Sequence, residues 1–172
     1  MDSKCTTIIE NLKKSYSYSE GFDEFLEYEE SEGFKYFIIN LSSLNKSVDA
    51  ANLTLSIDPG AKEIVIVAVV RSRRTENQTY KGVGKSLIYL AACKAIELDY
   101  TLKLSATPYS ESNGLFNYYN SIGLLRHANG VRGTGRNRGL KYETSPAKLK
   151  EIIAKTGGAR KTRKQRLPSL VY

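Results

Sequence analysis

The apolar positions of this chain change their spacing several times, and each spacing predicts a different element. The most continuous run is V-I-V-A-V-V at 65–70, where β-branched residues follow one another almost without interruption. Such a run predicts a central β-strand covered on both faces. After a polar gap, Leu87, Ile88 and Ala91 open a set of apolar residues at helical spacing. The middle of the chain therefore predicts a strand, a polar loop and a helix that begins near Val83.

Residues 6–30 carry the helical signal of the N-terminal part. Thr6 or Thr7 can cap a first segment, and Gly21 separates it from a second segment rich in phenylalanine and glutamate. We therefore expect two helices here. Acidic side chains crowd the stretch 20–32, which could attract a cationic ligand or form a solvated helix face.

Strands are predicted between these helices and the central helix. F-K-Y-F-I-I-N-L at 34–41 is aromatic and β-branched, and A-N-L-T-L-S-I at 51–57 alternates strictly. D-P-G at 58–60 supplies turn residues, with Gly60 at the third position of a tight turn. The chain then returns as 62–70, so the last two strands should form an antiparallel hairpin.

The second half of the chain predicts one parallel pairing. T-L-K-L-S-A-T at 101–107 alternates, and a strand, a helix and a strand in this order imply parallel strands joined by a right-handed crossover. A return strand at 139–144 and a helix over 146–155 with Ser145 as its N-cap follow. Residues 156–172 are strongly basic, and we expect a flexible tail there that could contact nucleic acid or an acidic partner.

Composition adds a domain count, a location and a charge asymmetry. A chain of 172 residues, 41% of them hydrophobic, is long enough for one core plus a tail. No apolar run approaches the roughly 18 residues of a membrane span, and the first residues are unlike a secretory signal, so we expect a cytoplasmic protein without membrane contact. Residues 1–64 carry 12 acidic and 6 basic side chains, a net charge of −6, whereas residues 65–172 carry 6 acidic and 20 basic ones, a net charge of +14. The basic part could attract anions.

The two cysteines, Cys5 and Cys93, are too few for a disulfide framework or a zinc site. Cys93 lies within the apolar helix, and we interpret it as a small core residue. We expect no metal. The single histidine, His127, is interpreted as structural.

Gly82 and Gly84 stand where the polar loop meets the predicted helix. The first amides of a helix have no partner within the helix, the helix dipole is positive there, and glycine lets an anion approach the backbone. The junction therefore predicts a phosphate-binding site. G-V-G-K-S also matches the end of the P-loop motif G-x-x-x-x-G-K-[ST], but that motif needs glycine at Thr79, so a P-loop nucleotidase is the least favoured interpretation.

The segment T-Y-K-G-V-G-K-S-L resembles the pyrophosphate-binding motif [QR]-x-x-G-x-[GA] of the GNAT acyl-CoA N-acyltransferases. Gly82 and Gly84 take the two glycine positions. Thr79 stands where glutamine or arginine is usual, with Gln78 or Lys81 available to take its place.

The segment at 108–125 resembles a second motif of that family, N-x-x-A-x-x-x-Y-x-x-x-G-F, in which a short helix carries a tyrosine. Tyr119 and Gly123 occupy the tyrosine and glycine positions, and Ser112 or Asn113 falls near the asparagine. Because the two motifs occur in the family's order, together they favour the GNAT superfamily.

The resemblance implies an α/β (α+β) fold in which a mixed, mostly antiparallel central sheet splays into a V between flanking helices. It implies a GNAT acyltransferase-like domain over 1–145, then the helix 146–155 and the basic tail 156–172. It also implies an N-acetyltransferase whose amine acceptor attacks acetyl-CoA directly, with no covalent enzyme intermediate.

The resemblance further implies residue roles. Tyr119 becomes the residue that protonates the departing thiolate, with Tyr118 as its competitor. Glu63 is the only acid in the long strand, but it lies too near the start of that strand to be assigned as the base. The residues implied in coenzyme binding lie on the long strand, the glycine loop and the short helix: Val69, Val70, Lys81, Gly82, Val83, Gly84, Lys85, Ser112 and Asn113.

Two alternatives remain beside this interpretation. A catalytically silent GNAT-like binding or regulatory module is favoured by Thr79. A nucleic-acid-associated protein acting through the basic C-terminal half is favoured by the net charge of residues 65–172. The sequence does not name the amine acceptor, because in this fold the acceptor pocket is built from the first helices and the closing hairpin, where no motif was found.

Overall fold

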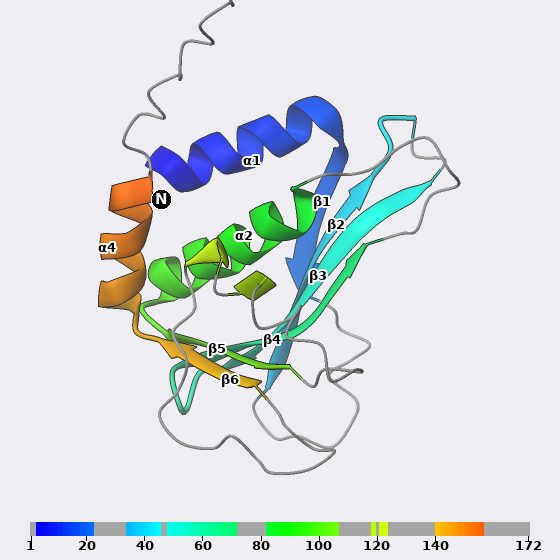
Figure 1. Ribbon diagram of the computed structural model, residues 1–172. Helices are drawn as coiled ribbons and strands as arrows, with labels where there is room; N and C mark the ends of the chain where they lie inside the picture. Colours follow the sequence, from blue (N-terminus) through cyan, green and yellow to red (C-terminus); the bar gives the residue numbers. More distant parts are fainter. Residues whose placement is uncertain are drawn as a thin grey trace, which may run out of the picture.

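The computed structural model describes residues 3–22, 34–45, 48–71, 82–106, 118–119, 121–123 and 140–156. Within these ranges the chain forms a six-stranded sheet with helices packed on it (Figure 1). The elements in chain order are α1 (Ser3–Ser15), β1 (Ser17–Phe22), β2 (Lys35–Ser42), β3 (Asp49–Asp58), β4 (Glu63–Arg71), α2 (Val83–Leu98), β5 (Thr101–Ala106), β6 (Leu140–Thr144) and α4 (Pro146–Thr156).

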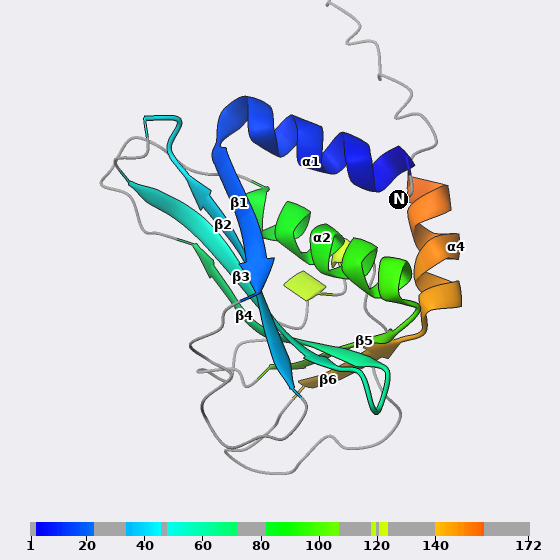
Figure 2. The same cartoon turned by 180° about the vertical axis from the view of Figure 1, so that it is seen from behind.

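The sheet has the order β1-β2-β3-β4-β5-β6, and every neighbouring pair is antiparallel except β4 and β5. Helix α2 packs on β3, β4 and β5, and both α1 and α4 pack against α2. Figures 1 and 2 show α4 crossing the N-terminal end of α1 and the C-terminal end of α2. The core lies between the helices and the sheet. Its largest fully buried apolar side chains come from α1, α2 and α4 and from the strands β2 to β6: Cys5, Leu41, Leu53, Leu55, Ile64, Leu87, Ile88, Leu102, Tyr142, Leu149 and Ile153.

The structure confirms most of the predicted elements. The hairpin of β3 and β4, the start of α2 at Val83 and the parallel pairing of β4 with β5 lie where the apolar spacing placed them. The hairpin turn differs in detail. Its left-handed residue is Lys62, with φ 55°, rather than Gly60, and a carboxylate oxygen of Asp58 accepts the N–H of Ala61.

The C-terminal helix α4 begins as predicted. The hydroxyl oxygen of Ser145 accepts the N–H of Lys148 at 3.3 Å, and its carbonyl accepts the N–H of Leu149. Ser145 is therefore the N-cap of α4, and Pro146 takes the first helical position, where its missing N–H costs nothing.

The prediction of helix over 6–30 was wrong for the second part of its described residues. The chain is helical only to Ser15, and Ser17–Phe22 form the edge strand β1. The register places Tyr18, Glu20 and Phe22 opposite the buried residues of β2, so these three side chains share the face that carries the helices. That period of two was obscured because Gly21 was interpreted as a break between two helices and Glu20 as part of the acidic second helix. Residues 23–33 lie outside the described ranges.

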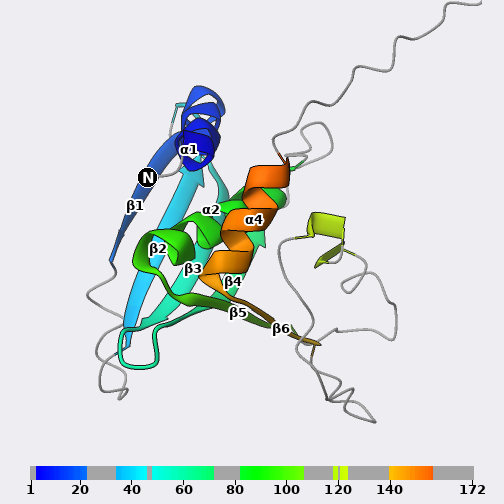
Figure 3. The same cartoon turned by 90° about the vertical axis from the view of Figure 1, so that its left-hand side faces the viewer.

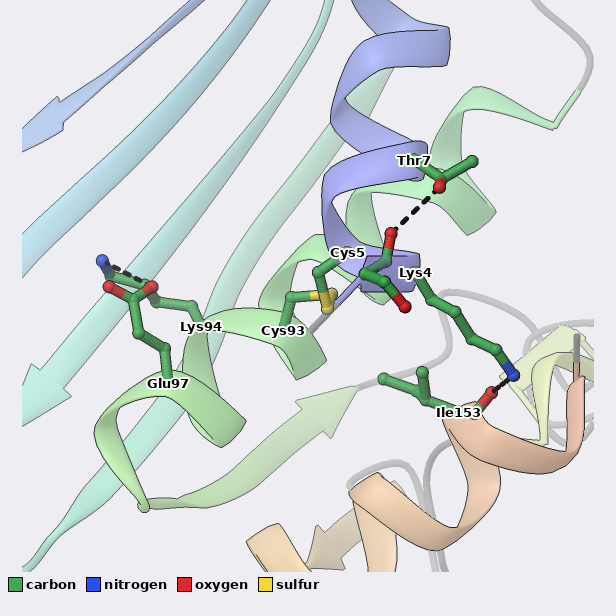
Figure 4. The surroundings of a disulfide bond; sticks show 8 residues. Lys4, Cys5, Thr7, Cys93, Lys94, Glu97 and Ile153 are labelled. Atoms are coloured by element: carbon green, nitrogen blue, oxygen red, sulfur yellow. Dashed lines mark hydrogen bonds and ion pairs between the residues drawn. A yellow bond between two sulfur atoms is a disulfide. The ribbon is translucent and has the colours of Figure 1, made fainter. Parts of the chain in front are cut away.

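Cys5 and Cys93 form a disulfide with each other, which corrects the interpretation of Cys93 as a small core residue. The bond joins the first turn of α1 to the middle of α2, with 5.8 Å between the two Cα atoms (Figure 4). Cys5 is buried on the stripe of α1 that also carries Leu12, and Cys93 packs at the margin of the core. The sequence separation of 88 residues hid this pairing, because the count of cysteines says nothing about which helix faces lie together.

Lys4 fixes the same end of α1 to α4. Its ammonium group donates hydrogen bonds to the carbonyl oxygens of Ile153 and Ala154 at 2.7 and 2.6 Å, and Figure 4 shows the first of these contacts. The last carbonyls of a helix have no partner within the helix, and a cation there also matches the negative end of the helix dipole. Adjacent residues of α1 therefore fix it to α2 and to α4.

Among the described residues, none of the helices is both long enough and apolar enough to cross a lipid bilayer.

We predict that Cys5→Ser lowers the free energy of unfolding by about 2–4 kcal/mol, because the disulfide closes a long loop in the unfolded chain. Urea denaturation under non-reducing conditions measures this change. Reductant should destabilise the wild-type chain by a similar amount and leave Cys5→Ser unaffected. Equal stability of the wild-type chain with and without reductant would contradict the prediction.

Candidate active site

Strands β4 and β5 part after a short parallel pairing. Glu63–Ile66 pair with Thr101–Leu104, and beyond that point β4 continues alongside β3 while β5 continues alongside β6. Figure 3 shows β4 and the pair of β5 and β6 diverging. Within the described residues, the edge of β4 from Val67 to Arg71 has no partner strand on the β5 side. The predicted V-shaped splay of the sheet is therefore confirmed.

A β-bulge lies where the strands part. Thr54 pairs with Ala68, but Leu55 pairs with Ile66, which leaves Val67 as an extra residue in β4. A bulge bends the strand and increases its twist, so it helps to turn β4 away from β5. The backbone groups beyond the bulge can bind an extended ligand as a strand would.

The exposure of side chains in β4 corrects the interpretation of this strand as one covered on both faces. Ile64 and Ile66 are buried in the core, but the side chain of Val67 is 53% exposed and that of Val70 is 49% exposed. Val69 is partly buried against the core. A continuous apolar run at this position therefore reflects one buried face plus an exposed apolar stretch along the open edge.

Helix α2 begins at a left-handed glycine. Gly82 has φ 83° and ψ −9°, and no side chain caps the helix. The carbonyl oxygen of Gly82 accepts the first helical hydrogen bond from the N–H of Ser86 at 3.1 Å, and the Ser86 hydroxyl also donates to it at 3.3 Å. The amides of Val83, Gly84 and Lys85 therefore occupy the first turn, where no carbonyl of the same helix can accept from them. This geometry fits an anion such as a phosphate group, because the donors and the positive end of the helix dipole coincide.

Tyr118 and Tyr119 lie between α2 and β6. A Cβ added to Gly84 would stand only 2.8 Å from the hydroxyl oxygen of Tyr118, so that hydroxyl lies against the first turn of α2. The ring of Tyr119 packs on Tyr118 at a centroid distance of 5.3 Å and on Tyr142 of β6 at 5.5 Å. The tyrosine pair therefore lies between the start of α2 and strand β6, which together with β5 diverges from β4.

The two tyrosines differ in environment. Tyr119 is 8% exposed, and burial raises the pKa of its phenol above the ordinary value, with smaller contributions from Tyr118 and Tyr142. Tyr118 is 40% exposed. Tyr119 therefore stays a neutral proton donor throughout the physiological range.

The remaining predicted residues are placed as follows. The backbone amide of Lys85 belongs to the first-turn donors, and its ammonium lies 5.8 Å from the ring centroid of Tyr89, one turn along α2. Val83 is buried. The coenzyme contacts predicted for Lys81, Ser112 and Asn113 lie outside the described residues.

Glu63 lies away from the open edge of β4. It forms an ion pair with Lys103 of β5, in the part of β4 that still pairs with β5. This hydrogen bond is the main cause that raises the pKa of Lys103. Among the described residues no group of histidine, cysteine, aspartate and glutamate side chains is placed to hold a metal ion.

The sequence did not show two features of this site. The sequence gives no sign that Val67 is an extra residue, because the apolar run at 65–70 has no alternation that a bulge could interrupt. The contact between Tyr118 and Gly84 joins the two motifs in space. The motif resemblance gives Tyr118 only as a competitor of Tyr119, and Gly84 is the local signal of a close approach to the helix.

No protein-family model matches the sequence, and no curated protein matches it. Solved structures do match the fold. Mutant forms of the spermidine/spermine N-acetyltransferase SpeG from Vibrio cholerae match with a TM-score of 0.55 at 8% identity, over 79% of this chain and 99% of theirs. A structure assigned as an acetyltransferase of the GNAT family from Desulfovibrio desulfuricans matches with a TM-score of 0.51 at 9% identity, over 85% of this chain and 94% of its own.

The chain spans only 30% of a third match, a tandem GNAT protein from the clavulanic acid biosynthesis pathway. That match covers 57% of this chain at 14% identity, with a TM-score of 0.47. The matches to SpeG and to the Desulfovibrio protein, together with the splayed sheet, show that the chain has the GNAT fold.

We predict that Gly82→Ala lowers the free energy of unfolding by about 1–2 kcal/mol, because a Cβ is unfavourable at this left-handed φ. The space around Gly82 is open, so the cost arises from the backbone alone. Gly21→Ala is the matched control, since that position is equally open and has no left-handed φ. Urea denaturation should show the control unchanged or stabilised by up to about 1 kcal/mol. Equal effects of the two substitutions would contradict the assigned conformation of Gly82.

Proposed function

We propose that this chain, which has the GNAT fold, is an N-acetyltransferase that moves an acetyl group from acetyl-CoA to a primary amine. The observation that carries the proposal is the combination of an uncapped helix start at Gly82 with the open edge of β4 from Val67 to Arg71. The helix start is suited to bind an anion, and the open edge of β4 is suited to bind an extended chain that contains amides. Acetyl-CoA has both parts, because its diphosphate continues into a pantetheine arm with two amide bonds.

The proposed binding mode follows from this match. The first-turn amides of Val83, Gly84 and Lys85 bind the diphosphate, and the left-handed backbone at Gly82 opens the approach. The pantetheine arm lies along β4, where the backbone of Val69 and Val70 offers strand-like hydrogen bonds. Lys81, Ser112 and Asn113 are proposed as further coenzyme contacts, on the motif resemblance alone.

The proposed reaction is a direct attack. The amine nitrogen bonds to the thioester carbonyl carbon, the carbon–sulfur bond breaks, and the sulfur leaves as a thiolate. Tyr119 gives its phenolic proton to that thiolate, the nitrogen loses its surplus proton to solvent, and the Tyr119 phenolate regains a proton from solvent, so the net reaction yields the amide and the free thiol. The protein contributes by holding the two reactants together and by providing the acid. Burial raises the pKa of Tyr119, which keeps the phenol protonated at neutral pH.

The structural neighbours support the class of reaction and leave the acceptor open. SpeG is named as an N-acetyltransferase of spermidine and spermine, which are polyamines. At 8% identity this likeness concerns the fold, so a polyamine is one candidate acceptor among the primary amines.

We predict that CoA and acetyl-CoA stabilise the chain against heat, and that ATP with magnesium does not. At a ligand concentration of 100 Kd the free energy of unfolding rises by about 2.7 kcal/mol, which raises Tm by about 5–10 °C for a chain of this size. Differential scanning fluorimetry measures the shift. A chain stabilised only by ATP with magnesium would contradict the proposed ligand.

The transfer itself is tested by release of free CoA thiol from acetyl-CoA in the presence of amines. Spermidine, an aminoglycoside and a lysine peptide should be compared, each with and without the protein. Turnover with at least one of them is expected. Binding of CoA without turnover on any amine in a wider screen would favour a catalytically silent binding module instead.

A further inference from the structure

The hydroxyl of Tyr118 lies beside the first turn of α2. Its oxygen stands 2.8 Å from the position that a Cβ on Gly84 would occupy. Since a Cβ lies about 2.5 Å from the amide nitrogen of its own residue, this oxygen is within roughly 5 Å of the Gly84 amide. Two donors this far apart can both reach one phosphate oxygen, because each hydrogen bond spans about 2.7–3.0 Å.

Tyr118 and Tyr119 have helical backbone and point to different sides of their segment. Successive residues of an α-helix point about 100° apart. Tyr119 accordingly turns into the core against Tyr142, whereas Tyr118 remains 40% exposed with its hydroxyl at α2. A single tyrosine in one orientation could not occupy both places.

We propose that Tyr118 is a coenzyme-binding residue, whose hydroxyl donates a hydrogen bond to the diphosphate bound at the first turn of α2. This inference rests on the proposed function. Tyr118 supplies a neutral donor from a separate element, in addition to the amides of Val83, Gly84 and Lys85. Tyr119 retains the role of acid at the sulfur, so the two adjacent residues contact different ends of the coenzyme.

The same contact explains the second glycine of the loop. Gly84 has no left-handed φ, so its backbone conformation does not require glycine. An alanine there would instead meet the Tyr118 hydroxyl at 2.8 Å, a distance that real Cβ contacts do not show. Because the obstructing atom is the end of a side chain, Tyr118 can move aside and the fold can accept the substitution. We therefore expect Gly84→Ala to displace the hydroxyl without unfolding the chain.

The first test compares Tyr118→Phe with Tyr119→Phe on the full chain. Isothermal titration with CoA should give about tenfold weaker binding for Tyr118→Phe, because a hydrogen bond to a charged acceptor is lost, while kcat at saturating acetyl-CoA stays within about twofold of the wild-type value. Tyr119→Phe should bind CoA as the wild type does and lose about 100-fold in kcat. If Tyr118 had a purely structural role, the substitution would not weaken CoA binding while leaving kcat nearly unchanged.

Tyr100→Phe is the matched control. Tyr100 follows the C-terminal end of α2, a helix of 16 residues whose two ends lie about 24 Å apart. The substitution removes the same hydroxyl group far from the proposed site. Both its Kd for CoA and its kcat should equal the wild-type values.

The second test uses Gly84→Ala alone and combined with Tyr118→Phe. If the alanine acts by displacing the hydroxyl, each single variant weakens CoA binding by about tenfold, and the double variant is weaker than either single one by less than about threefold. Independent, multiplying effects would mean that Gly84 and Tyr118 act separately and would overturn the proposed coupling.

The outcomes distinguish this inference from the proposed function. If wild-type protein does not bind CoA, the proposed function fails, and this inference fails with it. If wild-type protein binds CoA and Tyr118→Phe binds it equally well, the proposed function stands and only the role of Tyr118 is refuted. Thermal denaturation of each variant without ligand shows whether a loss of binding reflects a loss of folding.

Discussion

The limited pairing between β4 and β5 is the constraint from which the rest of this site follows. The two strands pair in parallel only from Glu63 to Ile66, and the extra residue at Val67 coincides with the point where they part. A strand in the middle of a sheet normally has both edges satisfied by neighbours, so its backbone is not available to a ligand. Here β4 keeps β3 on one side and, among the described residues, presents an open edge on the other beyond the bulge.

The packing of the helices determines where the first turn of α2 lies relative to the open edge of β4. Helix α2 packs on β3, β4 and β5, which sets the position of its first turn relative to the splay. The disulfide from Cys5 to Cys93 and the hydrogen bonds of Lys4 attach α1 to α2 and to α4. These attachments lie in the middle of α2 and at the C-terminal end of α4. The disulfide and the Lys4 hydrogen bonds therefore hold the helices together at points away from the first turn of α2.

The sequence predicted those parts of the fold whose signals are local. The alternation at 51–57, the glycines on either side of Val83 and the Ser145-Pro146 cap each lie within a few residues of the feature they determine. The strand β1 was missed because its alternation is short and includes Gly21. The disulfide and the contact of Tyr118 with Gly84 depend on residues far apart in the chain, so no local pattern could reveal them.

The sequence likewise predicted the local parts of the proposed site and not the contacts between distant residues. The motif resemblance located the start of α2 and the tyrosine helix, because both have a fixed spacing along the chain. It assigned Tyr119 as the acid with Tyr118 as its competitor, but it did not place either hydroxyl group, since the direction of a side chain depends on how this segment packs on α2 and β6. The buried ring of Tyr119 and the exposed ring of Tyr118 separate them in the structure.

Amide hydrogen exchange with and without acetyl-CoA tests the central claim most directly, because it reports on the open edge of β4 and on the first turn of α2 in one experiment. The account predicts slower exchange at residues 67–71 and at residues 83–85 when acetyl-CoA is bound, with no change in β2. Unchanged exchange at both segments under saturating acetyl-CoA would contradict it.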